Sequence, residues 1–407
     1  MTVGCAPATY QPLSSLTEAP APCATDATTI RAAGLLDGRG GAFTGAVVTV
    51  RGDVIASIDA CDGPVTHEFG NATILPGLID VHVHLDWHFG PDGRFDGRSA
   101  LSGASALERQ AAILTNARLT LEGGFTTVQS LGSPIDIALR EAIARGHAPG
   151  PRVLTSAGQI DPGSRAPDDL RAIVRSLEAS GADVIKAFAP EGMSSSTATQ
   201  RAVAQLQAIC GEARTLGLRS VVHAQDPPAI AAAVAAGCGQ VEHGTFADED
   251  TIRAMARARV YFDPNIGLVL QNYLEHRTAF LGAPGYTEER FRGMEAILPT
   301  LGPLFTRALA ARLQMPLGSD AVAGAHGRNA REIVARVRTG GQRPADAIVG
   351  ATSLAAESLG LADSIGTLAP GRQADVIVVQ GDPLRDIRSV ERVLFVMKGG
   401  RVYRTPE

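Results

Sequence analysis

The stretch Ile74-Leu75-Pro76-Gly77-Leu78-Ile79-Asp80-Val81-His82-Val83-His84-Leu85 decides the fold that we predict. Its nearly continuous apolar run begins after Pro76-Gly77 and predicts a buried β-strand. Side chains alternate along a strand, so His82 and His84 project from one face about 7 Å apart. Two imidazoles in this arrangement can bind one metal ion. They could equally be hydrogen-bonded core histidines, and the rest of the chain has to decide between these interpretations.

The composition of the 407-residue chain is that of an ordinary globular protein, with 45% hydrophobic and 19% charged residues. The formal net charge of -5 leaves no basic face for nucleic acid. No apolar run approaches the roughly 18 residues of a membrane span. We see no secretion signal at the N-terminus. We therefore expect a small-molecule substrate, no nucleic-acid or membrane partner, and a homo-oligomer.

The five cysteines, Cys5, Cys23, Cys61, Cys210 and Cys238, are scattered along the chain. They form no CxxC pair and no zinc-ribbon spacing, and their number is odd. We interpret them as small buried apolar residues or free thiols, which suits a reducing compartment. We therefore expect a cytoplasmic protein.

The two ends of the chain have a similar pattern of short strands. Residues 1–26 are rich in Ala, Pro, Thr and Ser and predict a loosely ordered arm. Strands are predicted at 29–33, 46–51 and 54–58, and again at 375–379, 393–398 and 401–403. Because an isolated two-stranded hairpin is marginally stable, we expect residues 27–73 and 366–407 to form one small β-sandwich domain together.

Between these ends, in residues 74–365, short apolar strands alternate with helical segments. Eight repeats of strand and helix predict an α/β fold, a parallel (β/α)8 TIM-like barrel. A doubly wound open sheet is the alternative, but the sequence contains no GxGxxG and no P-loop that would favour it. The predicted strands are 78–85, 126–130, 153–156, 184–188, 220–223, 239–242, 260–262 and 315–318, and the clearest helices are 106–122, 168–179, 197–216 and 228–236.

Catalytic groups in such barrels lie at the carboxyl ends of the strands. Five of the predicted strands end in, contain or are followed by a residue that can bind a metal. This set is much more specific than any one of its members. Its residues are His82 and His84 on the first strand, Lys186 on the fourth, His223 on the fifth, His243 on the sixth and Asp320 after the eighth.

Lys186 is the most informative residue of this set, because Lys186 and Lys398 are the only lysines among 37 basic residues. A buried ammonium needs a carboxylate partner or a strongly lowered pKa. The neutral amine can instead react with CO2 to form a carbamate, an anion that can bridge two metals, and arginine cannot do this at neutral pH. A Schiff-base lysine would leave the histidines unexplained. We therefore favour the carbamate.

At these residues the chain resembles the amidohydrolase superfamily, in its binuclear branch with a carboxylated lysine. This branch includes imidazolonepropionase-like hydrolases and Xaa-Pro dipeptidases. The matching segments are 75–84, 182–186, 222–224, 242–245, 318–321 and 365–376, and the similarity spans about residues 28–404. The resemblance implies one metal held by His82, His84, carboxylated Lys186 and Asp320, and a second held by the same carbamate with His223 and His243.

The resemblance also implies a reaction. Nitrogen and oxygen ligands suit two zinc ions, with manganese, cobalt or iron as alternatives. A metal-bridging hydroxide would attack a carbonyl carbon, and Asp320 would carry the proton to the leaving nitrogen. We expect hydrolysis of a C–N amide bond in a small molecule such as a dipeptide or an N-acyl amino acid. The alternatives are ring opening of a cyclic amide or lactone, deamination, and a non-catalytic metal-binding scaffold.

The residues that would contact the substrate are less well defined by the sequence. Gln225 stands where a tyrosine often follows the fifth-strand histidine in the resembled group, and no Gly-Gly-His segment follows the third strand. The segment 264–300 is long enough to act as a lid. Asp80 could orient an imidazole or pair with an arginine. Our candidate substrate contacts are His326, His88, Gln225, Asn265 and Tyr273.

Overall fold

The computed structural model describes residues 9–12, 21–96, 105–193 and 195–406. The chain divides into two compact units. The terminal unit contains residues 1–79, 121–126 and 343–407, and the central unit contains residues 80–120 and 127–342. No described helix is both long enough and apolar enough to span a membrane.

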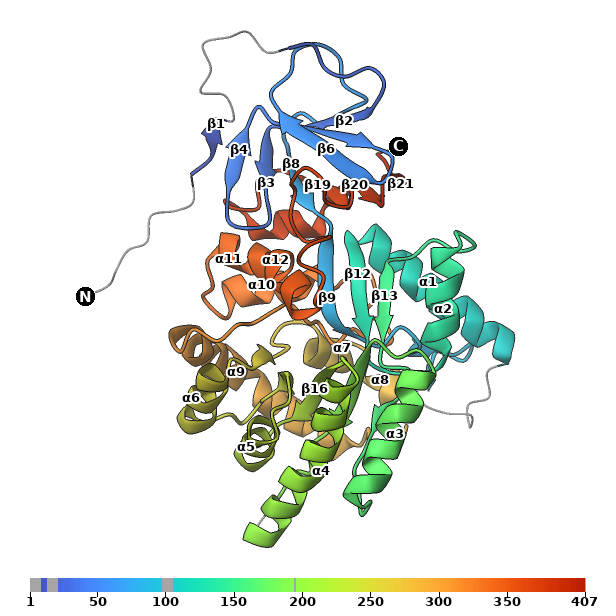
Figure 1. Cartoon of the computed structure of the whole chain (residues 1–407), viewed down its shortest axis with the longest axis vertical. Helices are drawn as coiled ribbons and strands as arrows, with labels where there is room; N and C mark the ends of the chain where they lie inside the picture. Colours follow the sequence, from blue (N-terminus) through green and yellow to red (C-terminus); the bar gives the residue numbers. More distant parts are fainter. Residues whose placement is uncertain (1–8, 13–20, 97–104, 194, 407) are drawn as a thin grey trace, which may run out of the picture. The chain divides into compact units, whose positions relative to one another are not determined.

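The terminal unit is built from strands of both chain ends (Figure 1). Its larger sheet has the order β1-β4-β3-β8-β19-β20-β21, and its smaller sheet has the order β6-β5-β2-β7. The strands are β1 (Gln11–Pro12), β2 (Thr28–Arg31), β3 (Gly34–Leu36), β4 (Ala42–Thr44), β5 (Val47–Arg51), β6 (Val54–Asp59), β7 (His67–Glu68), β8 (Ala72–Pro76), β19 (Val376–Gln380), β20 (Val393–Lys398) and β21 (Arg401–Arg404).

Apolar residues from both chain ends form one core in this unit. Strands β8 and β19 pair antiparallel, with Ile74 opposite Val378. Both side chains are fully buried together with Val48 and Phe395, so the two ends stabilise each other. The unit also contains the helices α11 (Pro344–Gly350) and α12 (Ser353–Ser358) and the 3-10 helix η1 (Ile387–Glu391).

The central unit carries the parallel strands that the sequence predicts. Strands β13, β12 and β9 form one sheet, β14 to β18 form a second, and β10 and β11 form a small antiparallel hairpin. Strands β9 and β12 begin in residues of the terminal unit. The strands are β9 (Leu78–Val83), β10 (His88–Phe89), β11 (Phe95–Asp96), β12 (Phe125–Ser130), β13 (Arg152–Thr155), β14 (Gln159–Ile160), β15 (Val184–Phe188), β16 (Arg219–Ala224), β17 (Gln240–His243) and β18 (Tyr261–Asp263).

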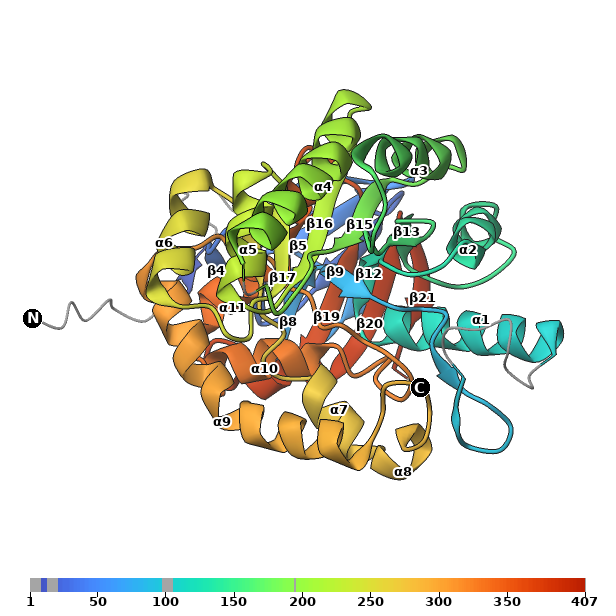
Figure 2. The same ribbon diagram turned by 90° about the horizontal axis from the view of Figure 1, so that it is seen from below.

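Amphipathic helices cover the outer side of these strands. In Figure 2, α4 runs along β16, and α4 also contacts β15. Leu206 and Ile209 of α4 share a buried core with Ile185 and Val222 of the strands. The helices are α1 (Ala106–Glu122), α2 (Ile135–Ala144), α3 (Pro167–Ala179), α4 (Ser196–Thr215), α5 (Pro227–Ala235), α6 (Glu249–Ala258), α7 (Val269–Glu275), α8 (Arg277–Phe280), α9 (Glu288–Ala310) and α10 (Ala330–Arg338).

The predicted eighth strand, 315–318, forms no ladder in the described structure. Leu317 O accepts from Val81 N of β9 (2.8 Å), and Gln314 O, just before the segment, accepts from Phe262 N of β18 (2.9 Å). Pro316 has no N–H to donate, and the N–H of Gly318 binds the carboxylate of Asp263 (3.0 Å). The described parallel strands of the central unit therefore form two sheets instead of the single closed ladder that we predicted.

The segment 264–300, which we considered as a lid, contains α7, α8 and the first half of α9. Its side chains are packed: Tyr273, Phe280 and Phe291 lie in a buried cluster with Trp87 and Val322. The segment therefore contributes to the core of the central unit. Movement of the segment as a lid stays a prediction.

The prediction that the cysteines are unpaired is wrong for four of them. Disulfides join Cys23 to Cys61 in the terminal unit and Cys210 to Cys238 in the central unit. Cys5 lies outside the described residues. The partners are 38 and 28 residues apart, so no short sequence spacing indicates the pairing. Because the expected cytoplasmic location depended partly on free thiols, that argument no longer supports it.

The predicted arm 1–26 lies partly outside the described residues. Within it, Gln11–Pro12 pairs with β4 and Cys23 is held by its disulfide. These described parts of the arm are therefore attached to the terminal unit and are not loose.

The disulfides lead to a first testable prediction. We expect iodoacetamide to alkylate one cysteine of the denatured protein before reduction and five after reduction, as counted by intact mass. Replacing Cys210 and Cys238 together by serine should lower the free energy of unfolding by about 3 kcal/mol, because the unfolded chain regains the entropy of a closed loop. Alkylation of all five cysteines without reductant would contradict the pairing.

Candidate metal centre

Six side chains of the central unit converge on one cavity of about 700 Å³. The ring centroids of four imidazoles follow one another: His84 to His82 is 5.3 Å, His82 to His243 is 5.4 Å and His243 to His223 is 4.5 Å. Lys186 of β15 and Asp320 line the same cavity. The structure thus brings together all six residues of the predicted ligand set.

The carboxylate of Asp320 lies between His82 of β9 and His84, which directly follows that strand. Its Oδ1 is 3.4 Å from Nε2 of His82 and 3.3 Å from Nε2 of His84. One ligand atom from each of these three residues lies within 4.8 Å of the other two, a spacing at which they could hold one metal ion. Nε2 of His82 is buried and has no hydrogen-bond partner among the described residues, so it is available to a metal.

Two further carboxylates lie on the other side of the His82 ring. Nδ1 of His82 contacts Oε2 of Glu242 and lies 3.6 Å from Oδ2 of Asp263, and both carboxylates are fully buried. Burial alone lowers the pKa of His82, but the carboxylates of Glu242 and Asp320 outweigh burial and raise it to about 10. A carboxylate on the far nitrogen of a metal-binding histidine fixes its tautomer and orientation. Glu242 is therefore a positioning residue that sequence reasoning missed.

Backbone geometry explains why Glu242 was missed. Strand alternation predicts that Glu242 and His243 point to opposite faces. His243, however, has a φ of 66°, in the left-handed region, and Asn265 (48°) and Asp320 (50°) also have left-handed φ values. Such strained positions concentrate at functional sites. The turn at His243 directs consecutive side chains toward the same centre.

Lys186 is 1% exposed, and burial lowers the pKa of its ammonium. No ion pair joins it to any residue that the structure describes, so the interpretation of Lys186 as half of a structural salt bridge lacks support. Nζ lies 6.0 Å from the ring centroid of Phe188. A lowered pKa increases the neutral fraction of the amine, which is the form that reacts with CO2.

Asp80 serves neither of the two roles that we considered. It accepts hydrogen bonds from the N–H and the hydroxyl of Ser319, from Nδ2 of Asn329 (2.7 Å) and from the N–H of His82 (3.1 Å). Burial raises its pKa to about 7. Asp80 therefore links Ser319, which precedes Asp320, to His82 of β9.

The candidate substrate contacts separate into two groups. Gln225, Asn265 and Tyr273 line the metal-centre cavity. His326 is buried elsewhere, with its ring against the backbone of His84 and Trp87. Its ring packs on the backbone that follows β9, and its role as a substrate contact stays a prediction.

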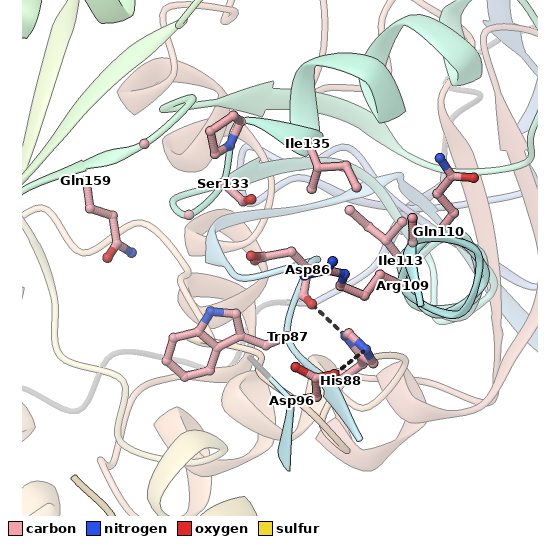
Figure 3. A pocket seen from close by; sticks show the side chains of 14 residues that line it. Asp86, Trp87, His88, Asp96, Arg109, Gln110, Ile113, Ser133, Ile135 and Gln159 are labelled. Atoms are coloured by element: carbon pink, nitrogen blue, oxygen red, sulfur yellow. Dashed lines mark hydrogen bonds and ion pairs between the residues drawn. The ribbon is translucent and has the colours of Figure 1, made fainter. Parts of the chain in front are cut away.

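His88 lines a neighbouring cavity of about 600 Å³ (Figure 3). Its Nδ1 lies 2.8 Å from the carbonyl of Asp86, and its Nε2 lies 3.8 Å from Asp96. The two cavities adjoin, because Trp87, Asp96 and Gln159 line both of them. His88 therefore lines this second cavity and not the one that contains the candidate metal ligands.

Comparison with known proteins places this centre in a family. The model of the amidohydrolase family matches residues 73–403. The chain belongs to the amidohydrolase family. This confirms the resemblance found in the sequence, and membership of the amidohydrolase family supports hydrolysis of amide bonds.

Similar proteins of the amidohydrolase family include ochratoxinase from Aspergillus niger. It is 26% identical over an alignment of 377 residues, which covers 82% of this chain and 76% of that protein. The crystal structure of a Xaa-Pro dipeptidase with bound methionine has a TM-score of 0.79 at 26% identity, covering 93% of this chain and 100% of that chain. The crystal structure of A. niger ochratoxinase has a TM-score of 0.75 at 23% identity, covering 94% and 96%. These amidohydrolase structures imply a TIM-like barrel fold with α/β content.

Proposed function

We propose that the protein is a metal-dependent hydrolase that cleaves the amide bond of a small molecule. The observation that carries this proposal is the convergence of four histidines, Asp320 and Lys186 on one cavity in a member of the amidohydrolase family. Two divalent ions would be held by His82, His84, His223, His243, Asp320 and a CO2-derived carbamate on Lys186.

The donor set fits such ions. It offers imidazole nitrogens and carboxylate oxygens without thiolate, which suits zinc, with manganese, cobalt or iron as alternatives. Divalent ions bound there would supply a hydroxide nucleophile at neutral pH and polarise the scissile carbonyl.

We propose that Asp320 moves the proton. Burial opposes its negative charge, but the imidazoles of His82 and His84 outweigh burial and hold the pKa of Asp320 well below its usual range. The carboxylate is therefore ionised near neutral pH, and its position beside both imidazoles is why we propose that it accepts a proton and delivers that proton to the leaving nitrogen. Glu242 holds the His82 ring in place during this transfer.

The lining of the cavity favours a substrate with an aromatic part. Trp87, Phe95, Tyr273 and Tyr286 line it, and such rings bind flat apolar groups. Relatives named as a dipeptidase and as an ochratoxinase support a peptide-like amide. We therefore propose dipeptides and N-acyl derivatives of aromatic amino acids as the substrate class.

The test combines metal content with activity. We expect two metal ions per subunit in protein purified without chelator, hydrolysis of at least one N-acyl aromatic amino acid or Xaa-Pro dipeptide, loss of activity after chelation, and recovery with zinc. Lys186→Ala should lose both metals, whereas Lys398→Ala, at the other lysine, should keep them.

Three results would count against the proposal. Full activity without metal would exclude metal dependence, and equal metal content in Lys186→Ala and wild type would exclude the carbamate. Bound metals without turnover of linear or cyclic amides would favour the non-catalytic scaffold. Turnover of cyclic amides alone would favour ring opening.

A further inference from the structure

Besides Lys186, which we propose is carboxylated, the metal-centre cavity contains one cation, Arg290, that makes no ion pair or side-chain hydrogen bond with any described residue. Most charged groups that line it have a contact: Asp320 meets two imidazoles, Asp96 faces His88, and the guanidinium of Arg94 donates to the carbonyl of Leu281. Arg290, which also lines the cavity, has no ion pair or side-chain hydrogen bond with any residue of the described chain. An arginine in this position can bind an anion.

The backbone of Arg290 is fixed even though its side chain is free. The residue lies in the first turn of α9, where its N–H donates to the hydroxyl of the N-cap residue Thr287 (3.2 Å). The pKa of Glu191 is lowered mainly by His223, whose Nε2 lies 3.4 Å from Oε1 of Glu191. The charge of Arg290 contributes only a smaller part of this lowering. The charge of Arg290 is therefore not neutralised by a direct contact.

Four aromatic side chains line the same cavity, and we call them the aromatic wall: Trp87, Phe95, Tyr273 and Tyr286. The rings of Trp87 and Phe95 are 5.2 Å apart, and those of Tyr273 and Tyr286 are 5.3 Å apart. The whole chain contains only one Trp and five Tyr, so this concentration marks an apolar binding surface. A ligand that uses both features carries an aromatic group and a negative charge.

We propose that Arg290 is a specificity-determining residue that binds the carboxylate of the substrate while an aromatic group lies against this wall. The inference rests on the proposed function and narrows its substrate to amides with a free carboxylate. A guanidinium suits this role because it can donate two parallel hydrogen bonds to a carboxylate. Gln225 is less suited, because its amide nitrogen lies 3.2 Å from Nε2 of His223.

The test measures binding as well as turnover by the metal-loaded enzyme. The probes are N-benzoyl-L-phenylalanine and N-benzoyl-2-phenylethylamine, which differ only in the carboxylate. By calorimetry we expect Arg290→Met to raise the Kd of the acid at least tenfold and to leave the Kd of the uncharged amide within twofold. Arg290→Lys should be intermediate. The matched control is Arg292→Met, on the same helix with an exposed side chain outside the cavity lining.

The outcomes separate this inference from the proposed function. Where the acid is hydrolysed, Arg290→Met should raise its KM tenfold or more and change kcat little, because the carboxylate contact is made in the ground state and the transition state alike. Equal effects of Arg290→Met and Arg292→Met, or equal effects on both probes, would overturn the inference. Binding of the acid that depends on Arg290, with neither probe hydrolysed, would keep the inference and count against the proposed function.

Discussion

Replacing Asp320 by asparagine is expected to lower kcat by about 10³-fold without unfolding the protein. The carboxylate lies between Nε2 of His82 and Nε2 of His84, and it is the group that we propose accepts and returns the proton. An amide cannot take up a proton near neutral pH, and loss of a general acid–base group reduces rates by about 10²–10⁴. Steady-state kinetics with the best substrate from the metal-dependence screen measure the effect.

Asparagine is the suitable replacement because of the backbone. Asp320 has a φ of 50°, a conformation that asparagine tolerates better than other residues with a side chain, and its N–H donates to the carbonyl of His82 (2.8 Å). The fold should therefore survive, as a circular dichroism spectrum and an unchanged melting temperature would show. Asp250→Asn, at an exposed acid on α6, is the control. A loss of less than tenfold in Asp320→Asn would show that another group carries the proton.

Much of this architecture could be predicted from the local sequence pattern. Helix α1 and strand β15 have the predicted bounds. The local hydrophobic pattern of a long amphipathic segment predicts a helix, and that of a short apolar run predicts a strand. The ligand set could also be predicted. Parallel strands bring their carboxyl ends together, so His82, Lys186 and His243 meet although they are far apart in the chain.

The features that were missed depend on contacts or on backbone angles. Pairing of Cys210 with Cys238 follows from the packing of two segments, and the spacing of the cysteines does not indicate it. Glu242 reaches His82 near a left-handed residue, which strand alternation does not predict. The eighth strand forms no ladder because Pro316 lacks a donor and Gly318 donates to a side chain. In each case tertiary structure determined what local propensity could not.

A buried arginine beside the candidate metal centre provides the prediction with the largest effect on stability. Arg336 of α10 is fully buried, donates to the carbonyls of Met315 (2.8 Å) and Pro316 (2.9 Å), and pairs with Asp263 at 3.1 Å and Glu332 at 3.6 Å. Replacing it by methionine fills a similar volume but leaves two carboxylates buried without their cation. Breaking a buried ion pair from one side typically costs about 3–5 kcal/mol. We therefore expect Arg336→Met to lower the free energy of unfolding by about 3–5 kcal/mol, as measured by urea unfolding of the metal-free protein. The control is Arg338→Met, at an exposed residue of the same helix, which should change the free energy of unfolding by less than about 0.5 kcal/mol.

The pH dependence of the difference between Arg336→Met and wild type tests the cause of this loss. Burial raises the pKa of Asp263 to about 6 and that of Glu332 to about 7 even with Arg336 present, and removing the cation should raise both further. A carboxyl whose pKa is higher in the folded state than in the unfolded state loses stability as the pH rises from its unfolded pKa to its folded one. The free energy of unfolding of Arg336→Met should therefore continue to fall to higher pH than that of wild type does. The difference in free energy of unfolding between the two proteins should be smaller at pH 5 than at pH 8. A difference independent of pH would mean that Arg336 stabilises the fold by packing and not by its charge.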